Sequence, residues 1–350
     1  MKLYLSSLAV LSIAAAIVAA ANPTLCIFGD SLSDIGTLKT LTFGLVPSKS
    51  YWEGRFSSGP VWNEYLAKLL NFNLYNRAIG GSTSDNDHST LIDILDINIP
   101  STENQMDFFK LINPQYSKDE TRSKDIAVLE VGANDFIANK AALKSGNMTV
   151  SFFVDRLSST VVSQLETLRA IGFKNIVLTN LATIQHTPMT KAEGIDDLAT
   201  KVVTEYNQKL ATVANAWAAK ASDLSSFMIS DIGSFLTLTI KSPAIIAALG
   251  LTDVTTACIS TGASDYSLKT LISLAMGENS GESACSNPST NYFFDDVHPA
   301  ERIHRLFGYY SFSEITAKAQ NSVFELNEAN ILSLISKYNL GTPAPKPATI

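Results

Sequence analysis

The sequence contains few basic residues and no cluster of them. It has 26 Lys and Arg against 33 Asp and Glu, a formal net charge of −7, and no run of Lys and Arg longer than two residues. A protein that binds nucleic acid needs a basic surface that neutralises phosphates. The composition therefore argues against nucleic acid as a partner.

Long apolar runs are absent beyond the N-terminus. The N-terminal segment combines Lys2, an apolar run over residues 8–20 and three consecutive alanines. This arrangement predicts a signal peptide over residues 1–21 that is cleaved near Ala20 or Ala21, and the alternative is an uncleaved membrane anchor. No other stretch of about 18 apolar residues occurs, so we expect a secreted, extracellular protein without stable membrane insertion.

Cysteine and histidine are also scarce, with three and four residues, and they form neither a CxxC pair nor a His cluster. The sequence therefore predicts no metal site and no cofactor. In an exported protein, Cys258 and Cys285 predict a disulfide, because they bracket a Ser-, Gly- and Asp-rich loop with little core of its own. Cys26 lies in an apolar run and is expected to be buried. Asn147 begins the sequon Asn-Met-Thr, a predicted glycosylation site.

Short apolar runs alternate with segments of helical periodicity along the chain. The runs predict strands buried on both faces, and they cover residues 24–29, 125–131, 175–181 and 227–232. The periodic segments predict helices, and they cover residues 60–69, 154–168 (closed by Gly172) and 195–217. This alternation predicts a mostly parallel sheet with helices on both faces.

We expect one domain over residues 22–340, because the chain shows neither an internal repeat nor an interdomain linker. Two segments break the alternation. Residues 85–110 are polar and are expected to form an insertion beside the site, and residues 240–292 are rich in loops. The Pro-rich tail over residues 341–350 is expected to be extended.

A serine stands directly after the first predicted strand. Ser31 follows Gly29 and Asp30, at the carboxyl edge where parallel sheets bind ligands. Acyl transfer needs a nucleophile and an oxyanion donor, and a serine there presents its hydroxyl and its own N–H together. The same letters also fit an ordinary turn, because Asp and Ser are frequent turn residues.

A second motif near the C-terminus supplies the base that a serine nucleophile needs. His298 is preceded by Asp295, which is close enough in sequence to reach Nδ1 from the same loop. Asp296 competes for this role, and the spacing favours Asp295. His88 also follows an Asp by three residues, but it lies in a polar Ser- and Asp-rich segment and is expected to be solvated. His186 follows a strand and is expected to line the cleft.

Two middle motifs offer donors for a developing oxyanion. The first is a Gly-Gly pair at Gly80 and Gly81, where the missing side chains let backbone N–H groups approach a ligand. The second is Asn134, which follows the second predicted strand and can donate from its side-chain amide. Each motif alone is weak evidence, because Gly-Gly and Asn-Asp pairs are common in turns.

Together, the four blocks GDSLSD, NRAIGGST, VGANDF and DDVHP resemble those of the SGNH hydrolases, the GDSL-type lipases and esterases, in the same order. The resemblance implies a flavodoxin-like three-layer α/β/α sandwich with a mostly parallel central sheet. It also implies that Ser31 is the nucleophile, His298 the general base and Asp295 its partner. Gly81 and Asn134 are the implied oxyanion donors beside the Ser31 N–H.

The segment GRFSSGPVW further resembles the larger secreted branch of this family, which includes the fungal carbohydrate acetylesterases of family 16. We therefore expect a secreted monomeric serine ester hydrolase that acts on short acyl esters of carbohydrates. A lipase or phospholipase for longer acyl chains is the alternative, and a non-catalytic binding protein of the same fold is a more distant one. The residues expected to line the substrate site are Asp30, Trp52, Phe56 and His186.

Overall fold

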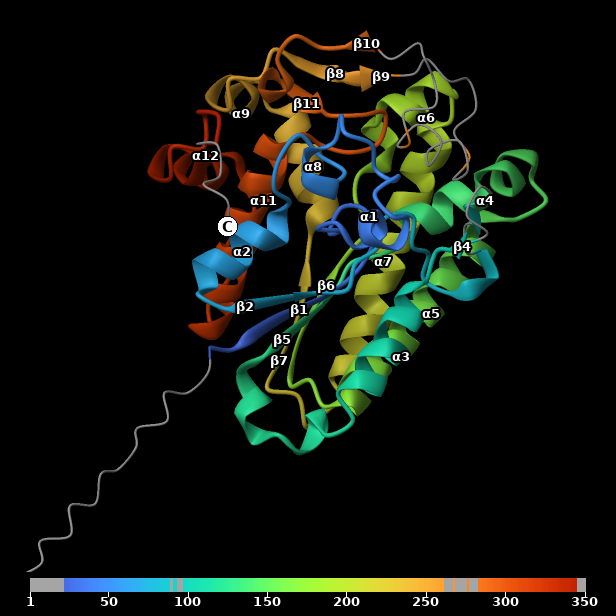
Figure 1. The fold of residues 1–350 in the computed structure, drawn as a ribbon, viewed down its shortest axis with the longest axis vertical. Coiled ribbons are helices and arrows are strands. Elements are labelled where there is room, and N and C mark those ends of the chain that lie inside the picture. Colours follow the sequence, from blue (N-terminus) through green and yellow to red (C-terminus); the bar gives the residue numbers. More distant parts are fainter. Residues whose placement is uncertain are drawn as a thin grey trace, which may run out of the picture.

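The computed structural model describes residues 22–88, 91–92, 97–260, 267, 276 and 283–344. Its centre is a five-stranded sheet in the order β2-β1-β5-β6-β7, with every neighbouring pair parallel (Figure 1). The strands are β1 (Thr24–Phe28), β2 (Asn73–Asn76), β5 (Ile126–Leu129), β6 (Asn175–Thr179) and β7 (Ser226–Ser230). The predicted parallel sheet is confirmed, and its order is the flavodoxin-like one.

Helices cover both faces of this sheet, as predicted (Figure 1). On one face lie α3 (Thr102–Ile112), α5 (Val150–Ile171) and α7 (Asp196–Ala218). On the other lie α2 (Trp62–Leu70), α8 (Ile232–Lys241), α9 (Pro243–Ala248), α11 (Glu301–Ala319) and α12 (Glu328–Lys337). Successive residues of β1 enter opposite cores, with Cys26 and Phe28 in one and Leu25 and Ile27 in the other. Burial on both faces explains the unbroken apolar sequence of this strand.

Further elements gather at the carboxyl ends of the strands (Figure 1). They are α1 (Thr37–Leu41), α4 (Ala133–Ser145), α6 (Pro188–Ala192), β8 (Asp253–Ala257), β9 (Ile259–Ser260), β10 (Ser283–Ala284) and β11 (Asn291–Phe293). Two further strands, β3 (Leu91–Ile92) and β4 (Ile97–Asn98), pair with each other. The loop-rich segment over residues 240–292 therefore contributes short strands as well as loops.

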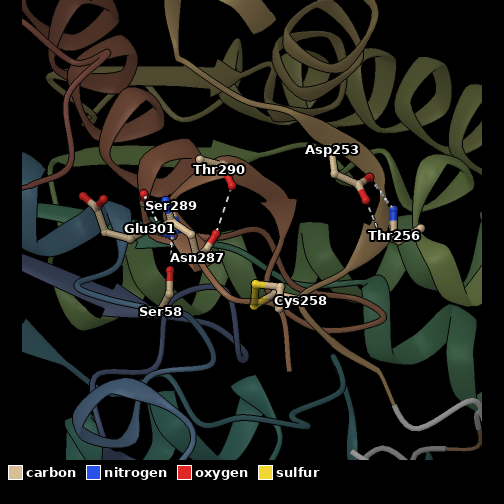
Figure 2. Close-up of a disulfide and its surroundings, with 9 residues drawn as sticks. Ser58, Asp253, Thr256, Cys258, Asn287, Ser289, Thr290 and Glu301 are labelled. Atoms are coloured by element: carbon tan, nitrogen blue, oxygen red, sulfur yellow. Dashed lines mark hydrogen bonds between the residues drawn. A yellow bond between two sulfur atoms is a disulfide. The ribbon is translucent and has the colours of Figure 1, made fainter. Parts of the chain in front are cut away.

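The predicted disulfide between Cys258 and Cys285 is present (Figure 2). Its segment hydrogen-bonds to the strand that leads to the proposed catalytic acid, since the Cys258 N–H donates to the Phe293 carbonyl at 3.1 Å. The N–H of Cys285 in turn donates to the Cys258 carbonyl at 2.8 Å. Cys26 is buried in β1, as predicted.

The segment over residues 85–110 differs from the expectation of a polar insertion. Its second half begins α3, whose capping residue Ser101 accepts a hydrogen bond from the Asn104 N–H. Met106 and Phe109 bury this helix against the sheet, so its polar sequence reflects only the outer face.

The two ends of the chain are described only in part. The predicted signal peptide, residues 1–21, lies outside the described residues, as do residues 345–350 of the tail. At the start of the tail, the Arg305 guanidinium donates to the carbonyls of Leu340 and Thr342. Within the described residues, no helix is both long and apolar enough to cross a bilayer.

Candidate active site

Ser31 lies in the turn that follows β1 at the carboxyl edge of the sheet. The turn is closed by the Ser33 N–H, which donates to the Asp30 carbonyl at 3.1 Å, and by the Leu32 N–H, which donates to Asp30 Oδ1 at 3.0 Å. The chain moves from β1 to β2 on one side, whereas β5 flanks β1 on the other. Ligands bind at such a reversal of strand order in open parallel sheets.

His298 and Asp295 meet Ser31 from the opposite end of the chain. Nε2 of His298 lies 2.6 Å from Ser31 Oγ, although 267 residues separate them. Nδ1 of His298 lies 2.7 Å from Oδ2 and 2.9 Å from Oδ1 of Asp295. The structure thus brings together the three residues that the sequence predicts as a triad, and the ring of His298 contacts Asp295 rather than Asp296 at these distances.

The surroundings of the Asp295 carboxylate favour its ionised form. Oδ1 accepts the N–H groups of Val297 and His298 at 2.8 and 2.7 Å. Burial alone raises the pKa of this carboxyl, but the neighbouring His298 and these hydrogen bonds outweigh burial and hold the pKa below its usual value. An ionised partner fixes the imidazole tautomer and stabilises the imidazolium.

The two predicted oxyanion donors lie on either side of the serine turn. Asn134, in the first turn of α4, donates from Nδ2 to the Ser82 carbonyl at 2.9 Å and to Asp30 Oδ2 at 3.3 Å. Gly80 donates its N–H to Asp34 Oδ2 at 2.8 Å, which leaves the next N–H as the candidate donor. That residue, Gly81, has φ 84, a backbone conformation that favours glycine.

A pair of buried carboxyl groups lies beneath the serine turn. Asp30 and Glu130 hydrogen-bond to each other, and Glu130 also accepts the Ser33 hydroxyl at 3.0 Å. Burial raises the pKa of both groups, and the charge of Glu130 raises that of Asp30 further.

A small apolar cavity of about 40 Å³ opens beside the triad. Besides Ser31 and His298, its lining comes mainly from apolar side chains, namely Leu32, Ala133, Ile137, Ala182, Ile184, Leu236, Phe293, Val297 and Pro299, together with the polar Asp30, Asn134, Thr183, Thr187 and Tyr292. The cavity therefore suits an apolar acyl group better than a polyhydroxylated one. Asp30 lines it as predicted.

Three other predicted lining residues lie outside this cavity. The ring of Phe56 is buried 5.1 Å from the His298 ring, and a Cβ added at Gly80 would lie 2.2 Å from it. Trp52 is half-buried under the Arg55 guanidinium, 4.8 Å from its ring centroid. His186 occupies a 3-10 helix over Ile184–His186, and burial, followed by the charges of two lysines, lowers its pKa.

Several residues that hold the loops of the site by hydrogen bonds are not apparent from the sequence. Asp34 accepts four backbone N–H groups and so joins the serine turn to the Gly-Gly loop. Gln105 of α3 accepts the Gly29 N–H at 2.9 Å and donates to the Gly29 carbonyl at 2.8 Å. Glu130 gave a usable signal, because it is the one charged residue within the apolar run over residues 126–131.

His304 is buried on α11. Burial, followed by the charge of His298, lowers its pKa to about 3. Asn147, the predicted glycosylation site, is exposed between α4 and α5. Among the described residues, no group of three or more His, Cys, Asp or Glu side chains is arranged to hold a metal ion.

The sequence of the chain matches a known protein family. The family model described as GDSL-like lipase/acylhydrolase matches residues 25–310. The phosphatidylcholine-sterol acyltransferase of Aeromonas hydrophila is 30% identical over 200 residues, which are 55% of this chain and 54% of that protein. The thermolabile hemolysin of Vibrio parahaemolyticus is 27% identical over 281 residues, 79% of this chain and 60% of that protein.

The chain thus spans between half and two thirds of these two relatives. Among solved structures, the acetyl xylan esterase AlAXEase aligns with a TM-score of 0.41 and 12% identity, over 83% of this chain and 98% of that one. The family match extends over most of the chain and ends only beyond His298. The chain belongs to the GDSL-like lipase/acylhydrolase family.

Proposed function

We propose that the protein is a serine carboxylic ester hydrolase that forms an acyl-enzyme on Ser31. The observation that carries the proposal is the continuous contact from Asp295 through His298 to Ser31, with 2.7 Å at one end of the imidazole and 2.6 Å at the other. A serine hydroxyl is a poor nucleophile without such a base. The intact triad also argues against a non-catalytic binding protein of this fold.

The reaction follows from this geometry in two steps. Ser31 Oγ attacks the ester carbonyl while Nε2 of His298 takes the hydroxyl proton. The oxyanion accepts the N–H groups of Ser31 and Gly81 and an amide hydrogen of Asn134, replacing the long 3.3 Å contact to Asp30. His298 then protonates the leaving alcohol, and water, deprotonated by the same nitrogen, releases the acid and restores Ser31.

The small cavity supports a short acyl group as the one transferred. Its volume of about 40 Å³ and its mainly apolar lining suit a short apolar acyl group. A carbohydrate as the alcohol stays a prediction. The two aromatic residues expected to line the substrate site lie outside the cavity, since Phe56 is buried and Trp52 stacks with Arg55.

A lipase or phospholipase is the second candidate. The specific observation in its favour is the similarity to a phosphatidylcholine-sterol acyltransferase, whose name indicates phosphatidylcholine as a substrate. Ile137, Ile184 and Leu236 line the cavity that the acyl chain of such a substrate would have to enter.

A series of p-nitrophenyl esters separates the two candidates. We expect kcat/KM to be highest for the acetate or butyrate and to fall steeply for the octanoate and palmitate, with no turnover in Ser31→Ala. A maximum at palmitate supports the lipase and contradicts the short-acyl proposal. The alcohol part of the natural ester is then tested by comparing the release of acetate from an acetylated oligosaccharide with the release of fatty acid from phosphatidylcholine vesicles.

Secretion is proposed on the evidence of the N-terminal sequence, and the disulfide is compatible with it. N-terminal sequencing of the protein from the culture medium tests this. A mature chain that starts near Asn22 supports secretion, and retention of the full-length chain inside the cells contradicts it.

A further inference from the structure

A tyrosine from a distant part of the chain contacts the catalytic carboxylate. The Tyr51 hydroxyl donates to Oδ2 of Asp295 at 2.8 Å, across 244 residues of sequence. Tyr51 precedes the 3-10 helix Trp52–Gly54 and is only 5% exposed. A buried hydroxyl whose hydrogen bond ends on an ionised group makes a strong, short contact.

This contact differs in origin from the others made by the same carboxylate. The hydrogen bonds to Oδ1 come from the N–H groups of Val297 and His298, within its own loop. Oδ2 lies between Nδ1 of His298 at 2.7 Å and the Tyr51 hydroxyl at 2.8 Å. The carboxylate oxygen that lies nearest to Nδ1 of His298 is therefore the one that also accepts the Tyr51 hydroxyl from outside the loop.

Aromatic packing aims the Tyr51 hydroxyl at this oxygen. Its ring meets the rings of Phe294 and Phe56 edge-on, with centroids 5.2 and 5.8 Å apart. Phe56 in turn lies tilted against the His298 ring at 5.1 Å. Because these contacts involve the ring, a phenylalanine at position 51 keeps this packing and loses the hydrogen bond to Asp295.

We propose that Tyr51 is a positioning residue of the reaction, which orients Asp295 toward His298 and limits how strongly the carboxylate attracts the Nδ1 proton. The proposal rests on the proposed ester hydrolysis. A donor on Oδ2 fixes the carboxylate plane and lowers its basicity, so the imidazole is held in one orientation and remains able to give up its proton. Tyr51 touches Asp295 and acts on the substrate only through it.

Other ionisable groups around the imidazole set the background for any pH effect. Asp30 lies on the side of the serine turn, and its charge interacts with His298. The charge of His298 also acts on His304 of α11. Neither Asp30 nor His304 takes part in the hydrogen bond between Tyr51 and Asp295, so both groups remain beside His298 when the Tyr51 hydroxyl is removed.

The test is Tyr51→Phe, measured on the best p-nitrophenyl ester over a range of pH. Loss of one hydrogen bond to a charged group is expected to lower kcat about tenfold with KM nearly unchanged. The freed carboxylate becomes more basic and stabilises the imidazolium, so the acid limb of the kcat/KM profile moves to higher pH. A folded variant with wild-type kcat and an unmoved acid limb overturns the proposal.

Tyr116→Phe is the matched control. Tyr116 is equally buried, and its hydroxyl donates to Asp125 Oδ2 at 3.0 Å at the amino end of the strands, far from the triad. We expect this variant to lose stability without a change in the pH profile. An equal shift of the acid limb in both variants assigns the effect to general loosening and overturns the proposal.

A double substitution separates positioning from a structural role. In an Asp295→Asn background, Tyr51→Phe is expected to cost no further activity, because its partner is already changed. The same tenfold loss in both backgrounds contradicts the proposal. If Tyr51→Phe does not fold, 3-fluorotyrosine at this position, a stronger donor, is expected to move the acid limb to lower pH, and no movement counts against the proposal.

A proton NMR measurement needs no ester turnover. The Nδ1–H resonance of protonated His298 is expected to move downfield in Tyr51→Phe, since its acceptor becomes more basic, and an unmoved resonance overturns the proposal. If the wild type hydrolyses no ester but the resonance differs between wild type and Tyr51→Phe as expected, only the proposed function is refuted. If the wild type hydrolyses esters but the resonance is the same in both proteins, only the role of Tyr51 is refuted.

Discussion

At the residue scale, the amide of Asn134 is the group whose resting contacts must change during the reaction. Its Nδ2 donates to the Ser82 carbonyl at 2.9 Å and to Asp30 Oδ2 at 3.3 Å. The second contact is long, so a negatively charged oxygen displaces it readily.

Asn134→Ala removes this donor. We expect kcat to fall by about 10²–10³ with a small change in KM, because the lost hydrogen bond forms mainly in the transition state. Asn139→Ala is the control, since Asn139 is buried on the same helix and donates to the Asp135 carbonyl at 2.8 Å. A loss of kcat of the same size in both variants would rule out the oxyanion role of Asn134.

At the scale of elements, burial decides which parts of the fold the sequence predicts. The strands β1 and β5 are buried along their whole length, and their apolar runs identify them. Strand β2 was missed, because its sequence Asn-Leu-Tyr-Asn is partly exposed at the sheet edge and has no apolar run. Likewise, the sequence of α3 suggests a polar insertion, because only one face of this helix is buried and the other carries polar residues.

The site divides in the same way. Ser31, Asp295 and His298 are predictable because short motifs hold them at strand ends. The contact of Tyr51 with Asp295 spans 244 residues, and no local pattern announces it. The pairing of Asp30 with Glu130 depends on β1 lying beside β5, which only the sheet order establishes.

The disulfide between Cys258 and Cys285 stabilises the segment beside β9, which hydrogen-bonds to the strand that leads to Asp295. Replacing both Cys258 and Cys285 with Ser is expected to lower the free energy of unfolding by about 2–4 kcal/mol, as is typical when a disulfide is removed. Activity should also fall, because Cys258 hydrogen-bonds to Phe293 just before Asp295. Chemical denaturation measures this, with Cys26→Ala as the control that keeps the disulfide. Unchanged stability of the double variant contradicts this stabilising role.

At the scale of the whole molecule, the fold brings two segments that are far apart in the sequence to one edge of the sheet. The turn after β1 provides Ser31, and the loop before α11 provides His298, with the matched family range enclosing both. Helices α2 and α11 pack against each other on one face of the sheet (Figure 1). The site therefore depends on the complete sandwich and not on any one segment.

The central claim is that Ser31 is the activated nucleophile, and covalent labelling with a fluorophosphonate tests it most directly. Intact mass and peptide mapping of the folded protein should show one adduct, on the peptide that contains Ser31. Ser31→Ala should show none, and His298→Ala should react far more slowly. A folded wild type that stays unlabelled, or a label that persists in Ser31→Ala, contradicts the account.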